Sequence, residues 1–231
     1  MGIVTLFKQS YSMLLQGLEM TMFLSVVSIA IAIVIGIVVG LINISKGKHN
    51  VFRVICGAYI DIIRGTPLIV QAFFIYFGLP VVVQAIGSKF GIVGLSTFKI
   101  NVILAGIIAT SLNAGAYMSE IFRGGILAVD SGQMEAARSL GIPYKKAMIT
   151  VVLPQAVRKM IPSLVNQFII SLKDTSILSV IGIQELTGNG QIIMASTYAA
   201  FQTWLFVGII YFVIIKIITI AARKVEERLT I

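Results

Sequence analysis

The sequence predicts an all-α membrane protein with about five transmembrane helices. Of its 231 residues, 58% are hydrophobic and only 12% are charged, and the mean hydropathy is +1.00. Soluble domains carry about 25% charged residues, so this composition indicates a protein of the lipid bilayer. Five apolar stretches are each long enough to cross a bilayer, which takes about 20 residues per helix. They cover residues 18–44, 54–86, 98–122, 160–182 and 203–222.

The distribution of basic residues predicts the orientation of these spans. Thirteen of the eighteen Lys and Arg residues fall on one side if the N-terminus is outside, while Lys8, Lys89 and Lys99 fall on the other. Basic residues concentrate in cytoplasmic loops, so we expect the N-terminus outside and the C-terminus in the cytoplasm. The thirteen are Lys46, Lys48, Arg53, Arg64, Arg123, Arg138, Lys145, Lys146, Arg158, Lys159, Arg223, Lys224 and Arg228.

The first span is preceded by residues 1–17, which we expect to form an amphipathic lead-in helix. This segment carries one charge, at Lys8, and leads into a span too long for the core of a signal peptide. Within the span, Gly36 and Gly40 form a G-x-x-x-G pair, which is typical of two helices that cross closely. We expect residues 1–231 to form a single transmembrane domain.

The second stretch is longer than a span requires, so its first part is expected to lie along the membrane interface. Thr66-Pro67 predicts a break, because proline leaves backbone carbonyl groups without donors, which is tolerated only against protein or water. Gln71 follows the break and either contacts a substrate or bridges helices. Asp61 and Arg64 lie three residues apart and are expected to pair.

The third span carries a polar stripe. Asn113, Tyr117 and Glu120 follow one another at i, i+4 and i+7, which places them on one helical face. A polar face on a span turns toward the interior of a bundle, so these residues either line a translocation path or hydrogen-bond between helices. For Glu120 we favour a salt bridge to Arg123, one turn further on.

A charged segment, residues 123–160, follows the third span. The run Glu135-Ala136-Ala137 favours a helix, and its alanines leave a smooth surface that a partner can approach. Gly141 can adopt the left-handed conformation that ends a helix, and Pro143 then prevents continuation. The segment is either a docking surface for a partner subunit or an ordinary loop that caps the bundle.

The spacing within this segment resembles the EAA loop of ABC importer permeases. Glu135-Ala136-Ala137 is followed by Gly141 and then by Leu153-Pro154 at the distances of that pattern, with Val151 where the family usually has Ile. In the family this loop occupies a cleft of the ATP-hydrolysing subunit. The resemblance therefore implies that residues 123–160 are a cytoplasmic loop coupled to an ATPase. From the sequence we also expect Pro154 to interrupt the second helix of the loop.

Two unlike charges, Lys173 and Asp174, interrupt the fourth span near its middle. A charge at the centre of a span costs about 2.5–3.5 kcal/mol on insertion scales and therefore indicates a functional site. Neighbours on a helix point about 100° apart, so the two are poorly placed to satisfy each other. We expect Lys173 to meet the carboxylate of an amino acid and Asp174 its α-amino group, with a hydroxyl from Ser176. The alternative is a structural ion pair to a neighbouring helix.

Three further segments are similar to those of polar amino-acid uptake permeases of the histidine, glutamine and arginine type. Gly65–Gln71 resembles their GTPLLVQ segment, Ala116–Ile126 their AYxAEIxRGGI stretch and Lys173–Ile177 their KDTSL element, with Ile177 in place of Leu. The likeness runs from about residue 17 to the end. It implies a type I ABC importer permease of a bacterial inner membrane, which moves a polar or basic amino acid by alternating access.

The resemblance also implies partners. These are an ABC ATPase that binds ATP and Mg²⁺, a second permease copy or a related permease, and an extracytoplasmic amino-acid-binding protein. Residues 183–201 form the long outer connection, in which Gly188-Asn189-Gly190 predicts a turn, and a surface for the binding protein is expected there.

The sequence argues against several other functions. It contains no G-x-x-x-x-G-K-[ST] phosphate loop, so we expect no cofactor in this chain and ATP hydrolysis in the partner. No catalytic set is recognisable, and His49 has no Cys or His neighbour that would make a metal site. No basic run alternates with aromatic residues as in a nucleic-acid groove. The remaining alternative is a gradient-driven secondary transporter or a channel-like protein, although no second copy of the Lys173-Asp174 element exists.

Overall fold

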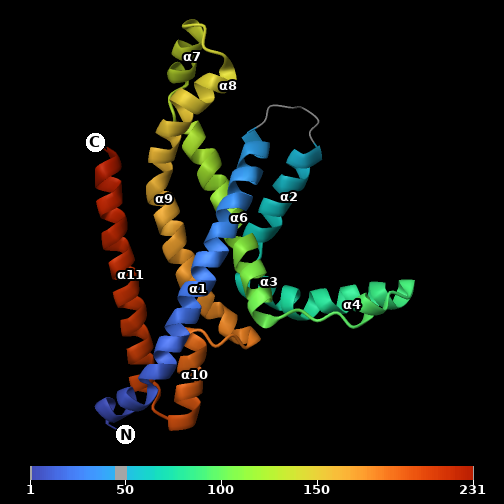
Figure 1. The fold of residues 1–231 in the computed structure, drawn as a ribbon, viewed down its shortest axis with the longest axis vertical. Helices are drawn as coiled ribbons and strands as arrows, with labels where there is room; N and C mark the ends of the chain where they lie inside the picture. Colours follow the sequence, from blue (N-terminus) through green and yellow to red (C-terminus); the bar gives the residue numbers. More distant parts are fainter. Residues whose placement is uncertain (1, 45–50, 231) are drawn as a thin grey trace.

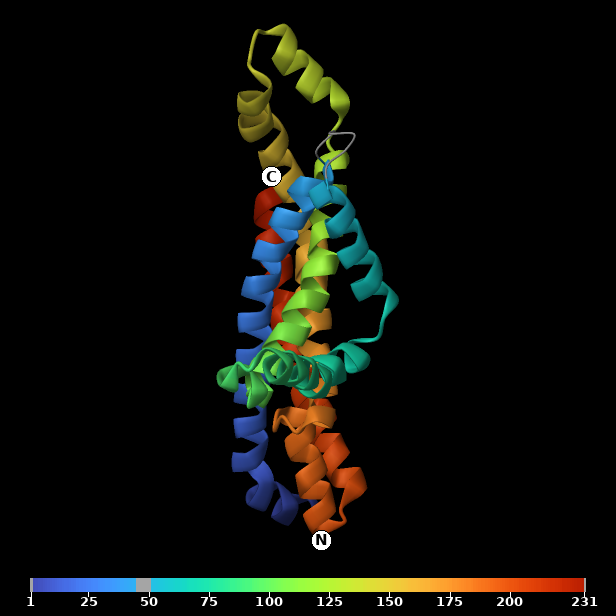
Figure 2. The same cartoon turned by 90° about the vertical axis from the view of Figure 1, so that its right-hand side faces the viewer.

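The structure, a computed structural model, describes residues 2–44 and 51–230 as an elongated bundle of helices. Figures 1 and 2 show α1 beginning at the end of the bundle opposite to α7 and α8, while α11 runs from that end toward them. Lys46, Lys48 and His49 lie outside the described residues. The helices are α1 (Ile3–Ile44), α2 (Val51–Gly65), α3 (Leu68–Phe73), α4 (Leu79–Phe90), α5 (Val93–Ser96), α6 (Val102–Leu127), α7 (Ser131–Ser139), α8 (Tyr144–Ala147), α9 (Leu153–Asp174), α10 (Leu186–Thr197) and α11 (Ala200–Thr230).

The prediction of five spans is confirmed. Within the described residues, five helical segments are long and apolar enough to cross a membrane. The lead-in expected at residues 1–17 is continuous with the first span from Ile3 onward. The five segments are Ile3–Ile44, Leu68–Phe90, Val102–Leu127, Tyr144–Ile181 and Ala200–Lys224.

Helices α1 and α6 form the centre of the bundle, and the G-x-x-x-G pair lies at their crossing. A Cβ atom added to Gly36 would lie 2.5 Å from the Cβ of Met118, and one added to Gly40 would lie 3.1 Å from the carbonyl oxygen of Ser119. Only glycine therefore permits this approach, and α6 is the partner helix of the pair. Further along the same contact, the hydroxyls of Ser28 and Thr110 lie 2.6 Å apart.

The second stretch is broken at Thr66-Pro67 as predicted, but its two parts are placed differently. Helix α2 packs on α6, where the Tyr59 hydroxyl donates to the Leu112 carbonyl at 2.6 Å, so the expectation that it lies apart along the interface is wrong. Instead α4 leaves the bundle and runs across its direction (Figures 1 and 2). The break lets α3 and α4 turn without any backbone strain, because Pro67 itself is extended.

Two short π-helical segments each precede a proline. The segment η1 (Phe74–Gly78) leads into Pro80 of α4, and η2 (Met148–Val152) leads into Pro154 of α9. Proline cannot donate to the carbonyl four residues earlier and its ring clashes there, and a wider turn relieves both problems. The expectation that Pro154 interrupts the helix is therefore wrong, since α8, η2 and α9 follow one another without a loop.

The end of the bundle opposite to α7 and α8 is closed by α10 (Figure 1). Gly188-Asn189-Gly190 was expected as a turn but lies within this helix. A Cβ on Gly188 would lie 2.4 Å from the Ile183 carbonyl oxygen, and one on Gly190 would lie 2.9 Å from Val207 of α11. These glycines allow close packing and do not reverse the chain. The local sequence alone does not distinguish these two uses of glycine.

Candidate functional site

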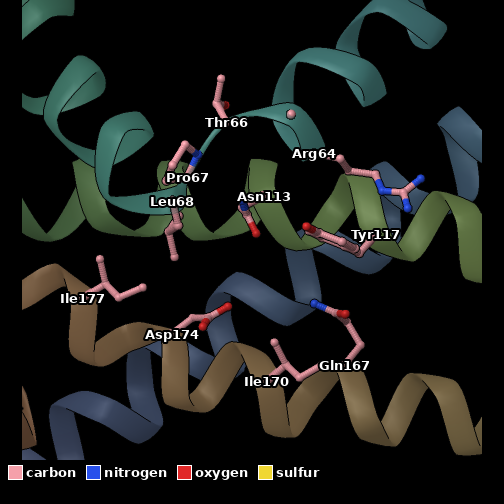
Figure 3. Close-up of a pocket in the computed structure, with 11 residues that line it drawn as sticks. Arg64, Thr66, Pro67, Leu68, Asn113, Tyr117, Gln167, Ile170, Asp174 and Ile177 are labelled. Atoms are coloured by element: carbon pink, nitrogen blue, oxygen red, sulfur yellow. The ribbon is translucent and has the colours of Figure 1, made fainter.

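A cavity of about 580 Å³ opens beside the break between α2 and α3. Figure 3 shows its walls: the broken segment on one side, α6 behind it, and α9 opposite. Three of the expected site residues, Asn113, Tyr117 and Asp174, line it together. The polar residues of the lining are Arg64, Thr66, Asn113, Tyr117, Gln167 and Asp174.

Gln71 donates hydrogen bonds to backbone carbonyl groups that the break beside this cavity leaves without helical partners. Pro67 has no N–H to offer the Ile63 carbonyl, and the Gln71 amide nitrogen donates to that oxygen at 2.8 Å. The same nitrogen lies 3.0 Å from the Thr66 carbonyl oxygen. Since its amide oxygen accepts from Asn113 at 3.1 Å, Gln71 bridges the broken segment to α6. Of the two roles left open for Gln71, the structure shows the bridge between helices.

Asn113 is held with its oxygen toward the cavity. Its amide nitrogen is used by Gln71, and Figure 3 shows the oxygen pointing across the space toward Asp174. One turn further along α6, the ring of Tyr117 lies 5.4 Å from the Arg64 guanidinium, in cation–π geometry. Both residues therefore present fixed groups to the cavity.

Asp174 is the one carboxylate on this cavity, and Figure 3 shows it directed into the space. Among the side chains of residues 2–44 and 51–224, none donates a hydrogen bond to Asp174 or forms a salt bridge with it, and the neighbouring Lys173 acts on it only electrostatically. Lys173 is exposed and does not line the cavity, so the two charges do not converge on one space. Ser176 does not line it either, and its carbonyl accepts from the Ser179 hydroxyl at 2.8 Å.

Glu120 joins two arginines at the edge of the cavity. Its carboxylate accepts two hydrogen bonds from the Nε and one from the Nη2 of Arg123, the shortest at 2.8 Å, which confirms the predicted salt bridge. Arg64 also lies 4.0 Å from this carboxylate. In the described part of the chain, Arg64 thus pairs with Glu120 and not with Asp61, so the expected Asp61–Arg64 pair is wrong.

A second cavity, of about 490 Å³, continues from the first toward the charged segment. Arg64, Tyr117 and Gln167 border both cavities, whereas Lys159 and Glu120 border only the second of the two. The stacked pair of Arg64 and Tyr117 therefore stands at the junction of one continuous path along α6 and α9.

The charged segment forms an exposed helical loop at the end of the bundle (Figures 1 and 2). Gly141 has φ of +80°, as predicted, and ends α7: its N–H donates to the Arg138 carbonyl and the N–H of Ile142 to the Ala137 carbonyl. Pro143 then caps α8. This pair of hydrogen bonds closes the turn between α7 and α8.

The surface of this loop is open to a partner. Within α7, Ala137 is buried, while Glu135 and Ala136 are exposed. Leu140 is 81% exposed at the tip, a large apolar side chain with no cover in the described chain. At the base, Leu153-Pro154 starts α9.

Sequence reasoning missed two residues of the cavity. Arg64 was assigned to a pair with Asp61, yet it lines the cavity. Gln167 is a polar residue within an apolar span and carried the same kind of signal as Asn113. Its side chain is buried and lines both cavities.

Comparisons with known proteins give a consistent result. Residues 32–231 match the family described as binding-protein-dependent transport system inner membrane component. The glutamine transport system permease protein GlnP of Escherichia coli strain K12 is 36% identical over 219 residues, 95% of this chain and 94% of that protein. The arginine transport system permease protein ArtQ of Bacillus subtilis strain 168 is 38% identical over 216 residues, 94% of this chain and 92% of that protein.

Solved structures agree with this assignment. A crystal structure of an amino acid ABC transporter with histidines contains a chain that superposes with a TM-score of 0.85, at 36% identity and with 99% of both chains covered. The MetNI methionine ABC transporter in an inward-facing conformation superposes with a TM-score of 0.72 at 19% identity, covering 95% of this chain and 97% of that one. The second likeness concerns the fold, that of a type I ABC importer permease.

Proposed function

Because the chain belongs to the family of binding-protein-dependent transport system inner membrane components, we propose that it is the membrane subunit of an ATP-driven importer of polar or basic amino acids. The observation that carries this proposal is the cavity beside the α2–α3 break, where no described side chain hydrogen-bonds to Asp174 or forms a salt bridge with it. An unpaired carboxylate in a bilayer is costly, and a cationic group of a substrate offsets that cost.

Asp174 binds the α-amino group in this proposal, as expected from the sequence. The Asn113 oxygen, which faces Asp174 across the cavity, accepts a second hydrogen bond from the same ammonium. Arg64 takes the role first assigned to Lys173 and binds the carboxylate, because it lines the cavity and its one ionic partner among the described side chains, Glu120, is 4.0 Å away. A guanidinium offers a carboxylate two parallel donors.

Tyr117 and Glu120 act on Arg64 rather than on the substrate. The Tyr117 ring fixes the guanidinium plane, and Glu120 supplies a counter-charge when the cavity is empty. Arrival of a carboxylate at Arg64 weakens its interaction with Glu120, so binding loosens a contact between α2 and α6. A substrate that favours one arrangement of these helices shifts the population toward it, as alternating access requires.

The loop of α7 and α8 couples this chain to its ATPase. Its closed turn at Gly141, its exposed Glu135-Ala136 face and its apolar tip suit a knob that enters a cleft of a partner subunit. ATP and Mg²⁺ bind to that partner, and closure of the ATPases moves the loop and, through α9, the cavity wall. A second permease copy or a related permease forms the other half, and an extracytoplasmic binding protein delivers the amino acid.

Uptake by vesicles tests the proposal. The chain is reconstituted with its ATPase and binding protein, with ATP inside and no ion gradient. We expect uptake that stops with Glu135→Arg and continues with Glu19→Arg, a matched charge reversal at an exposed position of α1. Uptake driven by an ion gradient without ATP, and indifferent to Glu135→Arg, would show a secondary transporter instead.

A further inference from the structure

A third cavity lies at the end of the bundle nearer to the α7–α8 loop and is separate from the cavity proposed to bind the substrate. It measures about 490 Å³ and is formed by the end of α1, the start of α2 and the last turns of α6. It shares no lining residue with the cavity that contains Asp174. Its polar lining residues are Asn43, Arg53, Glu120 and Arg123.

Positive charge is in excess around this cavity. Arg123 and the more distant Arg64 share one carboxylate, that of Glu120. Arg53 pairs with no acidic side chain among the described residues. The neighbouring segment 45–50 contains no Asp or Glu in its sequence, so it brings no counter-charge. Two guanidinium groups, those of Arg53 and Arg123, therefore line the cavity against one carboxylate, and an anion would balance the excess.

Outside the cavity lining, the start of α2 exposes large apolar side chains. Val51, Val54 and Ile55, at the start of α2, are 69%, 72% and 59% exposed. A Cβ added to Gly57, which lines the cavity, would meet no atom within 4 Å. An apolar face next to a basic cavity, at the basic end of a membrane bundle, is complementary to a molecule with an anionic head and an apolar tail.

We propose that this cavity binds the phosphate group of an anionic phospholipid of the cytoplasmic leaflet, held between Arg53 and Arg123. The forked donors of arginine match phosphate oxygens, and the acyl chains lie along the exposed face of α2. The site requires only that the chain resides in a membrane, so it does not depend on which substrate is transported.

The bound lipid acts on the transport path through Glu120, which borders both this cavity and the one at the Arg64–Tyr117 junction. A phosphate on Arg123 competes with Glu120 for the same guanidinium. Glu120 is then free to approach Arg64 more closely than the present 4.0 Å. An anionic lipid thereby strengthens the contact between α2 and α6 next to the path.

Native mass spectrometry tests the site directly. The full chain, with its ATPase, is released from nanodiscs that contain equal amounts of phosphatidylglycerol and phosphatidylcholine. We expect wild type to retain phosphatidylglycerol selectively and Arg53→Gln to retain about fivefold less, which corresponds to about 1 kcal/mol per basic residue near an anionic surface. Arg53→Lys keeps the charge but loses the fork, and should fall between the two.

The matched control is Arg223→Gln, which removes the same charge from an exposed position on α11 and should retain as much phosphatidylglycerol as wild type. Equal retention by wild type and Arg53→Gln would overturn the proposal. So would equal retention of phosphatidylcholine by wild type. Complete displacement by added inorganic phosphate would show that the cavity holds a free anion, and the lipid assignment would then fail.

Discussion

Asp174 and Glu185 are both carboxylates withdrawn from water, yet their surroundings are opposite. Asp174 lies on a cavity and has no hydrogen bond or salt bridge to a described side chain. Glu185 is fully buried and caps α10, where it accepts from the N–H groups of Thr187 at 2.9 Å and Gly188 at 2.7 Å. The Tyr211 hydroxyl of α11 donates to it at 3.0 Å.

This comparison separates a binding group from a structural group. Glu185 uses its hydrogen-bonding capacity to join α10 and α11, and Thr21 of α1 lies 3.4 Å from the same carboxylate. Nothing remains on Glu185 for a ligand. Asp174 retains its full capacity beside an open space, so substitutions at the two positions should affect different properties.

The largest effect is expected from Glu185→Ala. It leaves the N–H groups of Thr187 and Gly188 without their acceptor, and it leaves the Tyr211 hydroxyl only the Thr187 hydroxyl, at 3.3 Å. Each buried group without a partner costs about 1–3 kcal/mol. We expect the unfolding free energy of the purified chain in detergent to fall by about 3 kcal/mol or more. A loss below about 1 kcal/mol would mean that water reaches these groups and that α10 is not fixed by Glu185.

Asp174→Asn should leave stability almost unchanged and impair transport instead. Loss of a charge-assisted hydrogen bond to the substrate ammonium costs about 1.5–3 kcal/mol, so the KM for uptake should rise by about 10- to 100-fold. The measurement is ATP-driven uptake in vesicles. Asp61→Asn, the same change at an exposed position of α2, is the control. Unchanged KM together with reduced stability would make Asp174 structural, like Glu185.

Gln71→Ala tests whether Gln71 is a structural group, like Glu185, or a substrate-binding group, as proposed for Asp174. The Ile63 carbonyl and the Asn113 amide both lose their partner, so we expect the unfolding free energy to fall by about 1–2 kcal/mol. The released Asn113 should also raise the KM modestly. If KM rises as much as with Asp174→Asn while stability is kept, Gln71 contacts the substrate directly.

The smallest effect is a dependence of stability on pH. Burial raises the pKa of Glu185 above its ordinary value of 4.5, opposed in part by the hydrogen bonds from Thr187 and Gly188. The folded state therefore binds the proton more tightly than the unfolded chain, and stability rises as pH falls from the raised pKa toward the ordinary one.

Thermal unfolding of wild type and Glu185→Gln over that pH interval isolates this contribution. We expect wild type to gain stability relative to the variant by up to about 1 kcal/mol on acidification. A difference that stays constant with pH would show that the Glu185 carboxyl has its ordinary pKa.

The candidate site was only partly predictable. Asn113 and Tyr117 were placed together by helical spacing, because the face of a helix follows directly from residue number. Lys173 and Asp174 were expected to bind one substrate together. Because neighbouring residues on a helix point about 100° apart, only Asp174 lines the cavity. Arg64 was given the wrong partner, since its neighbour on α2 is closer in sequence than Glu120 but not closer in space.

The sequence alone determined the five spans, the break at Thr66-Pro67 and the closure of α7 at Gly141. These follow from the hydrophobicity and the backbone preferences of neighbouring residues, which act locally. Only the tertiary structure decided which groups converge: the cavity around Asp174, the closed network at Glu185 and the cluster of arginines near Arg53. Such convergence depends on how α1, α2, α6 and α9 pack, and periodicity specifies a face of a helix without specifying the helix that it meets.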